Sequence, residues 1–200
     1  MKSAFYRGSM KVLIVTAHPQ HDSFTQTLAQ RFAEGVNASG HEAEIADLYG
    51  EGFDPVVSIQ ELEGWKEGKI SPEIRAWQER IKSNDGLVLA YPVWWSTPPA
   101  ILSGWLQRVL TQGFAFQHNA GRTEGLLKLR AQMLVNIGSG KREDVDLATL
   151  YLEPMLGVLT YCGMEILPTQ ANWGVYAGAD PALLRAHLDR AFENGMQFFA

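Results

Sequence analysis

Short apolar runs alternate along the chain with stretches in which apolar side chains recur every three to four residues. Residues 11–17 (KVLIVTA) form a β-branched, nearly continuous apolar run, which predicts a strand buried on both faces of a parallel sheet. Further strands are predicted at residues 42–48, 86–91, 131–136 and 165–169. Such strands require helices on both faces of their sheet.

Helices are predicted between these strands. In residues 24–38 the apolar side chains share one face, and Gly40 supplies a C-terminal stop. Ser71 and Pro72 carry the signals of a helix start, and this helix is expected to end near residue 84. The other predicted elements are helices at residues 99–111, 146–161 and 181–197, and a helical turn at 59–65 within a long loop at 49–70.

The strict alternation of strands and helices predicts an α/β fold. We expect three layers around a doubly wound, five-stranded parallel sheet with right-handed crossovers, in the flavodoxin-like strand order 2-1-3-4-5. The length of 200 residues suits one domain, which we assign to residues 10–200. Residues 1–9 precede the first strand and are interpreted as an extension, either an alternative start or a cloning remnant.

Composition excludes several functional classes. The 17 basic and 22 acidic side chains give a net charge of -5 and are spread along the chain, so we expect no nucleic acid partner. The apolar runs are far shorter than the roughly 20 residues of a membrane span, and the first residues lack the apolar stretch of a secretory signal. The single cysteine, Cys162, cannot form an intramolecular disulfide. We therefore expect a soluble, cytoplasmic protein without membrane insertion.

In a doubly wound sheet, ligands bind beyond the carboxyl ends of the strands. The loop after the first strand, HPQHDSFTQ (18–26), brings His18, Ser23 and Thr25 to a helix N-terminus, where free N–H groups and the helix dipole favour a phosphate. Ordinary capping by Asp22 or Ser23 is the alternative. The loop contains neither the G-x-G-x-x-G dinucleotide fingerprint nor a Walker sequence.

Two further loops follow predicted strands. YPVWWSTPPA (91–100) holds Trp94 and Trp95 among prolines, and an indole is a flat surface on which a tricyclic ring can stack. The alternative is that one tryptophan fills the core, because adjacent residues in an extended segment point in opposite directions. NIGSG (136–140) is a glycine-rich turn whose N–H groups can approach a ligand closely, unless it is a plain turn. Together the three loops predict a ligand site.

At these residues the chain resembles the NAD(P)H:quinone oxidoreductase family of the DT-diaphorase type, and its bacterial relative, the flavoprotein subunit of glutathione-gated potassium efflux. The resemblance spans almost the whole chain after residue 10. It is carried by HPQHDSF (18–24), KEGKISPEI (66–74), YPVWWSTPPAILSGWLQRVLTQGFAF (91–116), NIGSG (136–140) and YCGMEILP (161–168).

The resemblance implies a flavodoxin-like fold, a flavin cofactor (FAD or FMN), NADH or NADPH as reductant, and a homodimer with sites at the interface. The implied reaction is a two-electron hydride transfer from NAD(P)H through the flavin to a quinone with ping-pong kinetics, since one pocket serves both substrates. The flavin carries the redox chemistry, and the protein supplies stacking, orientation and electrostatic tuning.

The resemblance also implies roles for individual residues. His18, Ser23, Phe24 and Thr25 are expected to hold the flavin phosphate and ribityl chain; Pro92, Val93, Trp94, Trp95 and Ser96 to line the isoalloxazine; and Asn136, Ile137, Gly138, Ser139 and Gly140 to flank its pyrimidine edge. Phe116 and His118 match positions over the substrate, contributed by the second subunit. For His118, a solvated loop histidine is the alternative.

The sequence departs from the family pattern after the glycine turn. DT-diaphorase relatives carry a tyrosine and a histidine there, whereas this chain has Lys141, Arg142, Glu143 and Asp144. We hypothesise that the N–H groups of the turn, helped by Lys141, support negative charge at the pyrimidine edge. A solvated surface lysine is the alternative. No metal ion is expected.

The choice of flavin and of function leaves alternatives open. The segment between residues 55 and 64 is shorter than in relatives that bind the adenine half of FAD, whereas Arg190 resembles a family arginine near the adenylate, so both FAD and FMN are kept. An azo- or nitroreductase, a regulatory subunit of a potassium efflux system and a one-electron flavodoxin carrier are the alternative functions. Cys162 is interpreted as a buried structural thiol.

Overall fold

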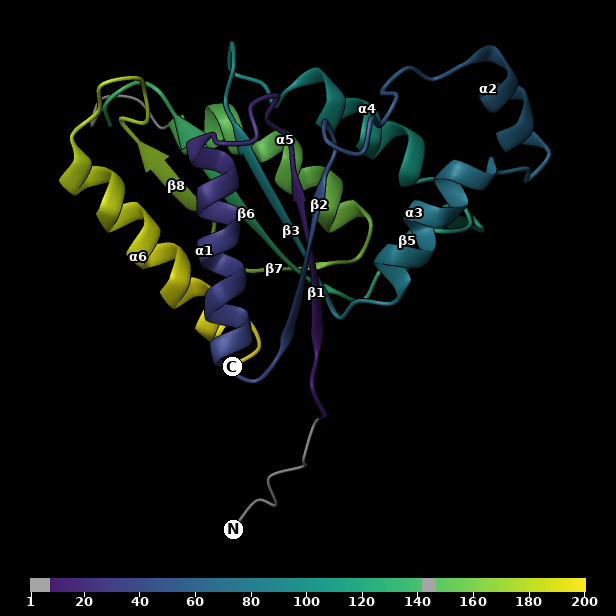
Figure 1. Ribbon diagram of the computed structural model, residues 1–200. Helices are drawn as coiled ribbons and strands as arrows, with labels where there is room; N and C mark the ends of the chain where they lie inside the picture. Colours follow the sequence, from purple (N-terminus) through teal and green to yellow (C-terminus); the bar gives the residue numbers. More distant parts are fainter. Residues whose placement is uncertain (1–7, 142–146) are drawn as a thin grey trace.

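The computed structural model describes residues 8–141 and 147–200 and has a parallel sheet at its centre (Figure 1). Its strands lie in the order β2 (Glu42–Asp47), β1 (Lys11–Thr16), β3 (Gly86–Pro92), β6 (Arg130–Ile137) and β7 (Glu165–Ile166), and all neighbouring pairs are parallel. This is the predicted order 2-1-3-4-5, and the flavodoxin-like fold is thereby confirmed.

The fifth strand position is occupied by two short strands instead of the single strand predicted at residues 165–169. β7 is followed by β8 (Gln170–Trp173), and both pair with β6. The break occurs at Pro168, which has no N–H to donate to the ladder. The side chain of Gln132 on β6 fills the gap by donating to the Pro168 carbonyl at 2.8 Å.

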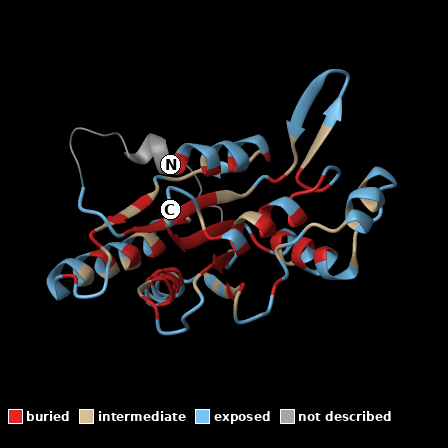
Figure 2. Cartoon of the chain, turned by 90° about the horizontal axis from the view of Figure 1, so that it is seen from above, coloured by how far each residue is buried: buried red, intermediate tan, exposed pale blue. Residues whose placement is uncertain are grey.

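Helices cover both faces of the sheet (Figure 1). α1 (Phe24–Ala38) and α6 (Pro181–Gln197) pack side by side over one face, where Val12 and Ile14 of β1 contact them. α3 (Pro72–Lys82), α4 (Ala100–Val109) and α5 (Leu147–Tyr161) cover the other face, which receives Leu13 and Val15. Figure 2 shows the sheet buried between these layers.

The two helices of the first face approach each other closely at glycines. A methyl group on Gly35 of α1 would lie 2.1 Å from the carbonyl oxygen of Phe192, and one on Gly195 of α6 would lie 2.1 Å from that of Phe32. Neither position can hold a side chain unless the helices separate. The glycines therefore fix the spacing of α1 and α6, and with it the position of α6 relative to the start of α1.

A hairpin of β4 (Phe116–Asn119) and β5 (Arg122–Gly125) lies outside the main sheet and was not predicted from the sequence. Its two-residue turn places Ala120 at φ 46° and Gly121 at φ 81°. In a sequence, two-residue hairpin turns are predicted from the dipeptides Asn-Gly or Asp-Gly. An alanine as the first turn residue gives no such signal.

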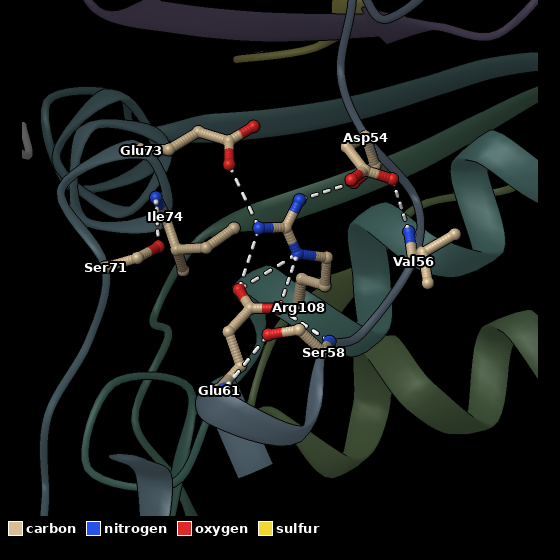
Figure 3. Close-up of polar contacts among 8 residues, drawn as sticks. All are labelled: Asp54, Val56, Ser58, Glu61, Ser71, Glu73, Ile74 and Arg108. Atoms are coloured by element: carbon tan, nitrogen blue, oxygen red, sulfur yellow. Dashed lines mark hydrogen bonds and ion pairs between the residues drawn. The ribbon is translucent and has the colours of Figure 1, made fainter. Parts of the chain in front are cut away.

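The predicted helical turn at residues 59–65 is a helix, α2 (Ile59–Lys66), with a capping box between Ser58 and Glu61. α2 has no buried residue and is held through the buried guanidinium of Arg108 on α4 (Figure 3). Arg108 donates to Glu61 at 2.7 Å, to Glu73 of α3 at 3.0 Å and to the Asp54 carbonyl.

The charges in this cluster stabilise one another. Burial acts against a charged carboxyl at Glu61, but hydrogen bonds from Arg108 and from Ser58 outweigh it and hold the pKa of Glu61 below its usual value. Burial likewise acts against the charge of Arg108, and hydrogen bonds from its side chain to Glu61 and Glu73 raise the pKa of Arg108. Both groups are therefore ionised near neutral pH.

Candidate functional site

The first loop of the site ends at the N-terminus of α1. Ser23 is the N-cap residue, and its Oγ accepts from the Gln26 N–H at 3.3 Å, so the capping interpretation holds for Ser23. Among the described residues, no atom accepts from the backbone N–H groups of Phe24 and Thr25. Two unpaired N–H groups and the positive end of the helix dipole together favour an anion at this point.

His18 lies at the start of this loop, just beyond β1. Its Nδ1 accepts from the backbone N–H of Gln20 at 3.1 Å, so the neutral ring carries its proton on Nε2. Burial lowers the pKa of His18, which favours this neutral form. The ring also lies edge-on to the indole of Trp94, with the centroids 5.7 Å apart. His18 can therefore donate one hydrogen bond to a bound group.

The second loop follows β3 and projects from the protein at its tip. Trp94 and Thr97 exchange backbone hydrogen bonds of 2.9 and 3.0 Å, and the turn between them holds Trp95 at φ 50° and Ser96 at φ 62°. Trp94 is 41% exposed and Trp95 is 99% exposed. The alternative that one tryptophan fills the core is therefore wrong, because the tight turn directs both indoles away from it.

The third loop, after β6, is tied to its neighbours by backbone hydrogen bonds. The Val93 N–H donates to the Asn136 carbonyl at 2.8 Å, and the N–H groups of Gly174 and Val175 donate to the Ser139 and Ile137 carbonyls at 2.9 and 3.0 Å. A methyl group placed on Gly138 would meet only one atom within 4 Å. The turn is thus open on the side where a ligand can approach its backbone.

The three loops enclose one open pocket of about 180 Å³ at the carboxyl ends of β1, β3 and β6. It brings together eight residues selected from the sequence: His18, Phe24, Thr25, Pro92, Val93, Trp94, Asn136 and Gly138. Val175, from the loop after β8, also lines it and was missed, because the predicted fifth strand ended before this segment.

The other residues selected from the sequence lie outside this pocket. Ser23 caps α1, Ile137 is buried in the core, and Lys141 is exposed. Trp95, Ser139 and Gly140 belong to the flanking loops without lining the pocket. The expectations for Arg142, Glu143 and Asp144 lie outside the described residues.

An apolar groove runs along α4 and α5, beside the pocket loops. Its larger part measures about 450 Å³ and includes Phe116, whose ring lies 5.1 Å from that of Tyr161. Its smaller part, of about 260 Å³, begins at Ser96 on the second loop. His118 bonds Thr123 across the hairpin at 3.0 Å and is exposed. Phe116 and His118 thus lie apart from the pocket of their own chain.

Cys162 ends the groove and is buried, with 2% of its surface exposed. Burial raises the pKa of the Cys162 thiol to about 11, so the thiolate is scarce at neutral pH. This agrees with the interpretation of Cys162 as a structural thiol.

The family follows from the sequence profile described as "Flavodoxin-like fold", which matches residues 10–194. The chain belongs to this family. A Haemophilus influenzae protein named an uncharacterized NAD(P)H oxidoreductase is 36% identical to this flavodoxin-like protein over 162 residues, which cover 78% of this chain and 80% of that protein. NAD(P)H dehydrogenase (quinone) 1 of Cavia porcellus is 28% identical over 190 residues, covering 82% of this chain and 69% of the relative.

Comparison with solved structures identifies similarity to the same group of proteins. The NAD(P)H:quinone oxidoreductase from Methanothermobacter marburgensis matches the flavodoxin-like protein with a TM-score of 0.84 and 28% identity, over 96% of this chain and 100% of that one. The resemblance to NAD(P)H:quinone oxidoreductases is thereby confirmed, whereas closeness to the potassium-efflux flavoprotein stays a prediction. Within residues 8–141 and 147–200, no helix has the length and apolar character needed to cross a membrane.

Proposed function

We propose that this protein is a flavin-dependent NAD(P)H:quinone oxidoreductase. The observation that carries the proposal is the pocket at the carboxyl ends of β1, β3 and β6, where a helix N-terminus, an exposed indole and an open glycine turn meet. The relatives named above as NAD(P)H-dependent and quinone-reducing enzymes support the choice of reaction.

The residues present fit a flavin nucleotide. The unpaired N–H groups of Phe24 and Thr25 suit its phosphate, since an anion there completes the hydrogen bonding of α1. His18 offers an Nε2–H donor beside them, and Trp94 offers an apolar face for the ring system. Gly138 leaves the backbone of the third loop accessible to the polar edge of the ring.

A bound flavin supplies the hydride chemistry from NADH or NADPH to a quinone. The chain itself binds the phosphate at α1, orients the ring between the second and third loops, and presents the N–H groups of the turn at residues 138–140 to its pyrimidine edge. Lys141 is exposed at the end of this turn, and its support of negative charge there stays part of the proposal.

We propose a homodimer whose second copy covers the groove along α4 and α5. One chain forms a pocket of about 180 Å³, below the roughly 300–1,000 Å³ of sites that enclose a drug-sized ligand. The groove begins at Ser96 on the pocket's second loop, so a copy seated there extends toward the pocket. Phe116 and His118 of each chain are then available to the pocket of the other.

Extraction of the cofactor tests the proposal. The purified protein is expected to be yellow, and mass spectrometry of the released cofactor then distinguishes FAD from FMN. Anaerobic addition of NADH or NADPH should bleach the absorbance and identify the preferred reductant. A colourless protein that binds no added flavin contradicts the proposal.

Steady-state rates test the acceptor. Quinones are expected to be reduced faster than azo dyes or nitroaromatics, with parallel lines in double-reciprocal plots because one pocket serves both substrates in turn. Faster azo reduction favours the azoreductase alternative. Co-purification with a membrane protein, together with low quinone reduction, favours the regulatory subunit of a potassium efflux system.

A further inference from the structure

A row of hydrogen-bonded polar side chains lies directly beneath the pocket and joins α6 to α1. Arg190 of α6 donates to Asn172 Oδ1 on β8 at 2.8 Å. Asn172 Nδ2 lies 3.0 Å from Asn136 Oδ1 on β6, and Asn136 Nδ2 lies 3.0 Å from Thr25 Oγ1 on α1. Asn172, Asn136 and Thr25 are all buried. The sequence carries a signal for this row, because the two buried positions of β8, Gln170 and Asn172, are polar.

The direction of each hydrogen bond in the row follows from its outer end. A guanidinium can only donate, so the atom of Asn172 that faces Arg190 must be Oδ1. Gln170 provides a second constraint, because its Nε2 donates both to the His187 carbonyl at 2.8 Å and to Asn172 Oδ1 at 2.9 Å. The amide of Asn172 therefore faces Asn136, and the amide of Asn136 faces Thr25. All three bonds point toward the pocket.

Thr25 is the end of the row and has one proton left to donate. Its Oγ accepts from Asn136, and within the described part of the chain no atom accepts its hydroxyl proton. The side chain is 2% exposed and lines the pocket, beside the unpaired N–H groups of Phe24 and Thr25. A buried donor without a partner is costly unless a ligand accepts from it.

We propose that Arg190, Asn172 and Asn136 are positioning residues that hold the Thr25 hydroxyl as an obligate donor to the phosphate of the bound nucleotide. The inference rests on the proposed flavin site and adds to it a basis for selecting the phosphate. An ionised phosphate oxygen only accepts and matches a donor of fixed direction. Riboflavin lacks that group and gains nothing from the relay.

Asn172→Asp reverses the row with almost no change in shape. The new carboxylate still accepts from Arg190 and Gln170, but it has no amide to offer Asn136. Asn136 then turns its own amide toward this carboxylate and its carbonyl oxygen toward Thr25, whose proton is drawn away from the pocket. The affinity of the flavin-free full-length protein for FMN should fall by roughly 10- to 100-fold, the range of a hydrogen bond to a charged group.

A double-mutant cycle separates the relay from simple charge repulsion. Thr25→Val should weaken FMN binding as much as Asn172→Asp, and Asn172→Asp should add nothing in the Thr25→Val background. Riboflavin affinity should change less than twofold in each variant. A loss of FMN affinity from Asn172→Asp that persists in the Thr25→Val background, or an equal loss for riboflavin, overturns the relay.

Two further results separate this inference from the proposed function. If Asn172→Asp does not fold, Thr25→Ser, which keeps the hydroxyl, should retain FMN affinity that Thr25→Val loses; equal affinities overturn the inference. If the wild-type protein binds flavin and the variants bind FMN as tightly as the wild type does, the relay alone is overturned. Wild-type protein that binds neither FMN, FAD nor riboflavin overturns both.

Discussion

Individual polar residues beneath the pocket have roles that their hydrogen-bond partners decide. His187 on α6 is buried, its Nε2 lies 3.0 Å from the Trp173 carbonyl, and its Nδ1 lies 3.4 Å from Arg190. A carbonyl only accepts and a guanidinium only donates, so the ring is neutral with its proton on Nε2. Burial, and then the charge of Arg190, lower the pKa of His187.

The stability of the protein should therefore fall in mild acid. A group with a lowered pKa in the folded state stabilises the fold above its unfolded pKa of about 6.5, and this contribution is lost as the pH falls through the folded pKa. The free energy of unfolding is measured by denaturant titration at several pH values from 8 to 5. It should decline once the pH falls below about 6.5. His187→Gln should reduce the decline, leaving the part due to His18. An unchanged slope contradicts the assignment.

Pairs of elements are held together by a few close contacts. α1 and α6 depend on glycines, whereas α2 depends on the charge cluster around the buried Arg108. In both cases the sequence indicates the helices but not the contact, because a glycine or an arginine within a helix has many uses. Only the folded chain shows that Gly195 meets the Phe32 carbonyl or that Arg108 meets Glu61.

Gly195→Ala should destabilise the protein by about 2 kcal/mol, as expected for overpacking. Its methyl group would overlap the Phe32 carbonyl and separate α6 from α1. The control is Gly157→Ala on α5, in the groove, where a methyl group meets nothing within 4 Å in the single chain. That change should be neutral or stabilise the helix by up to about 1 kcal/mol. Equal effects of the two substitutions in denaturant unfolding would argue against the close approach.

Arg108→Met should cost about 3 kcal/mol, since it leaves the carboxylate of Glu61, whose side chain is only 11% exposed, without its partner. Residues 53–70 should become sensitive to limited proteolysis before the rest of the chain unfolds. Arg80→Met removes a more exposed arginine that bonds Glu44 and Glu51 and is the matched control. Its cost should stay below about 1 kcal/mol. A small effect of Arg108→Met would mean that α2 is held by other contacts.

For the whole molecule, the fold was largely predictable, because buried parallel strands and amphipathic helices give strong periodic signals. The pocket was predictable to the extent that its residues follow strands in the sequence. Val175 and Asn172 were not assigned to it, because the predicted fifth strand ended at residue 169, before β8 and the loop that follows it. Arg190 was expected near an adenylate, and its bond to Asn172 was not foreseen. The hairpin was missed because Ala120 occupies a position where glycine or asparagine is the usual signal.

The proposed assembly predicts a charge-sensitive interface. Val158→Glu, at a groove position that is 37% exposed, should convert the dimer to monomer in light scattering and reduce quinone turnover. Leu183→Glu on α6 is the control, since Leu183 is 39% exposed and lies on the opposite face. It should leave both the mass and the turnover unchanged. If the Val158→Glu variant remains a dimer with full activity, the dimer interface does not include this groove.

The break in the fifth strand position also bears on how the protein avoids aggregation. An unbroken edge strand offers a row of free N–H and C=O groups to which another chain can add. Here Pro168 removes one donor, and the Gln132 side chain donates to the carbonyl of Pro168 itself. The opposite edge, β2, carries Glu42, Glu44 and Asp47 along a six-residue strand. Both borders of the sheet therefore resist strand addition, which leaves the helices as the surfaces available to the proposed dimer.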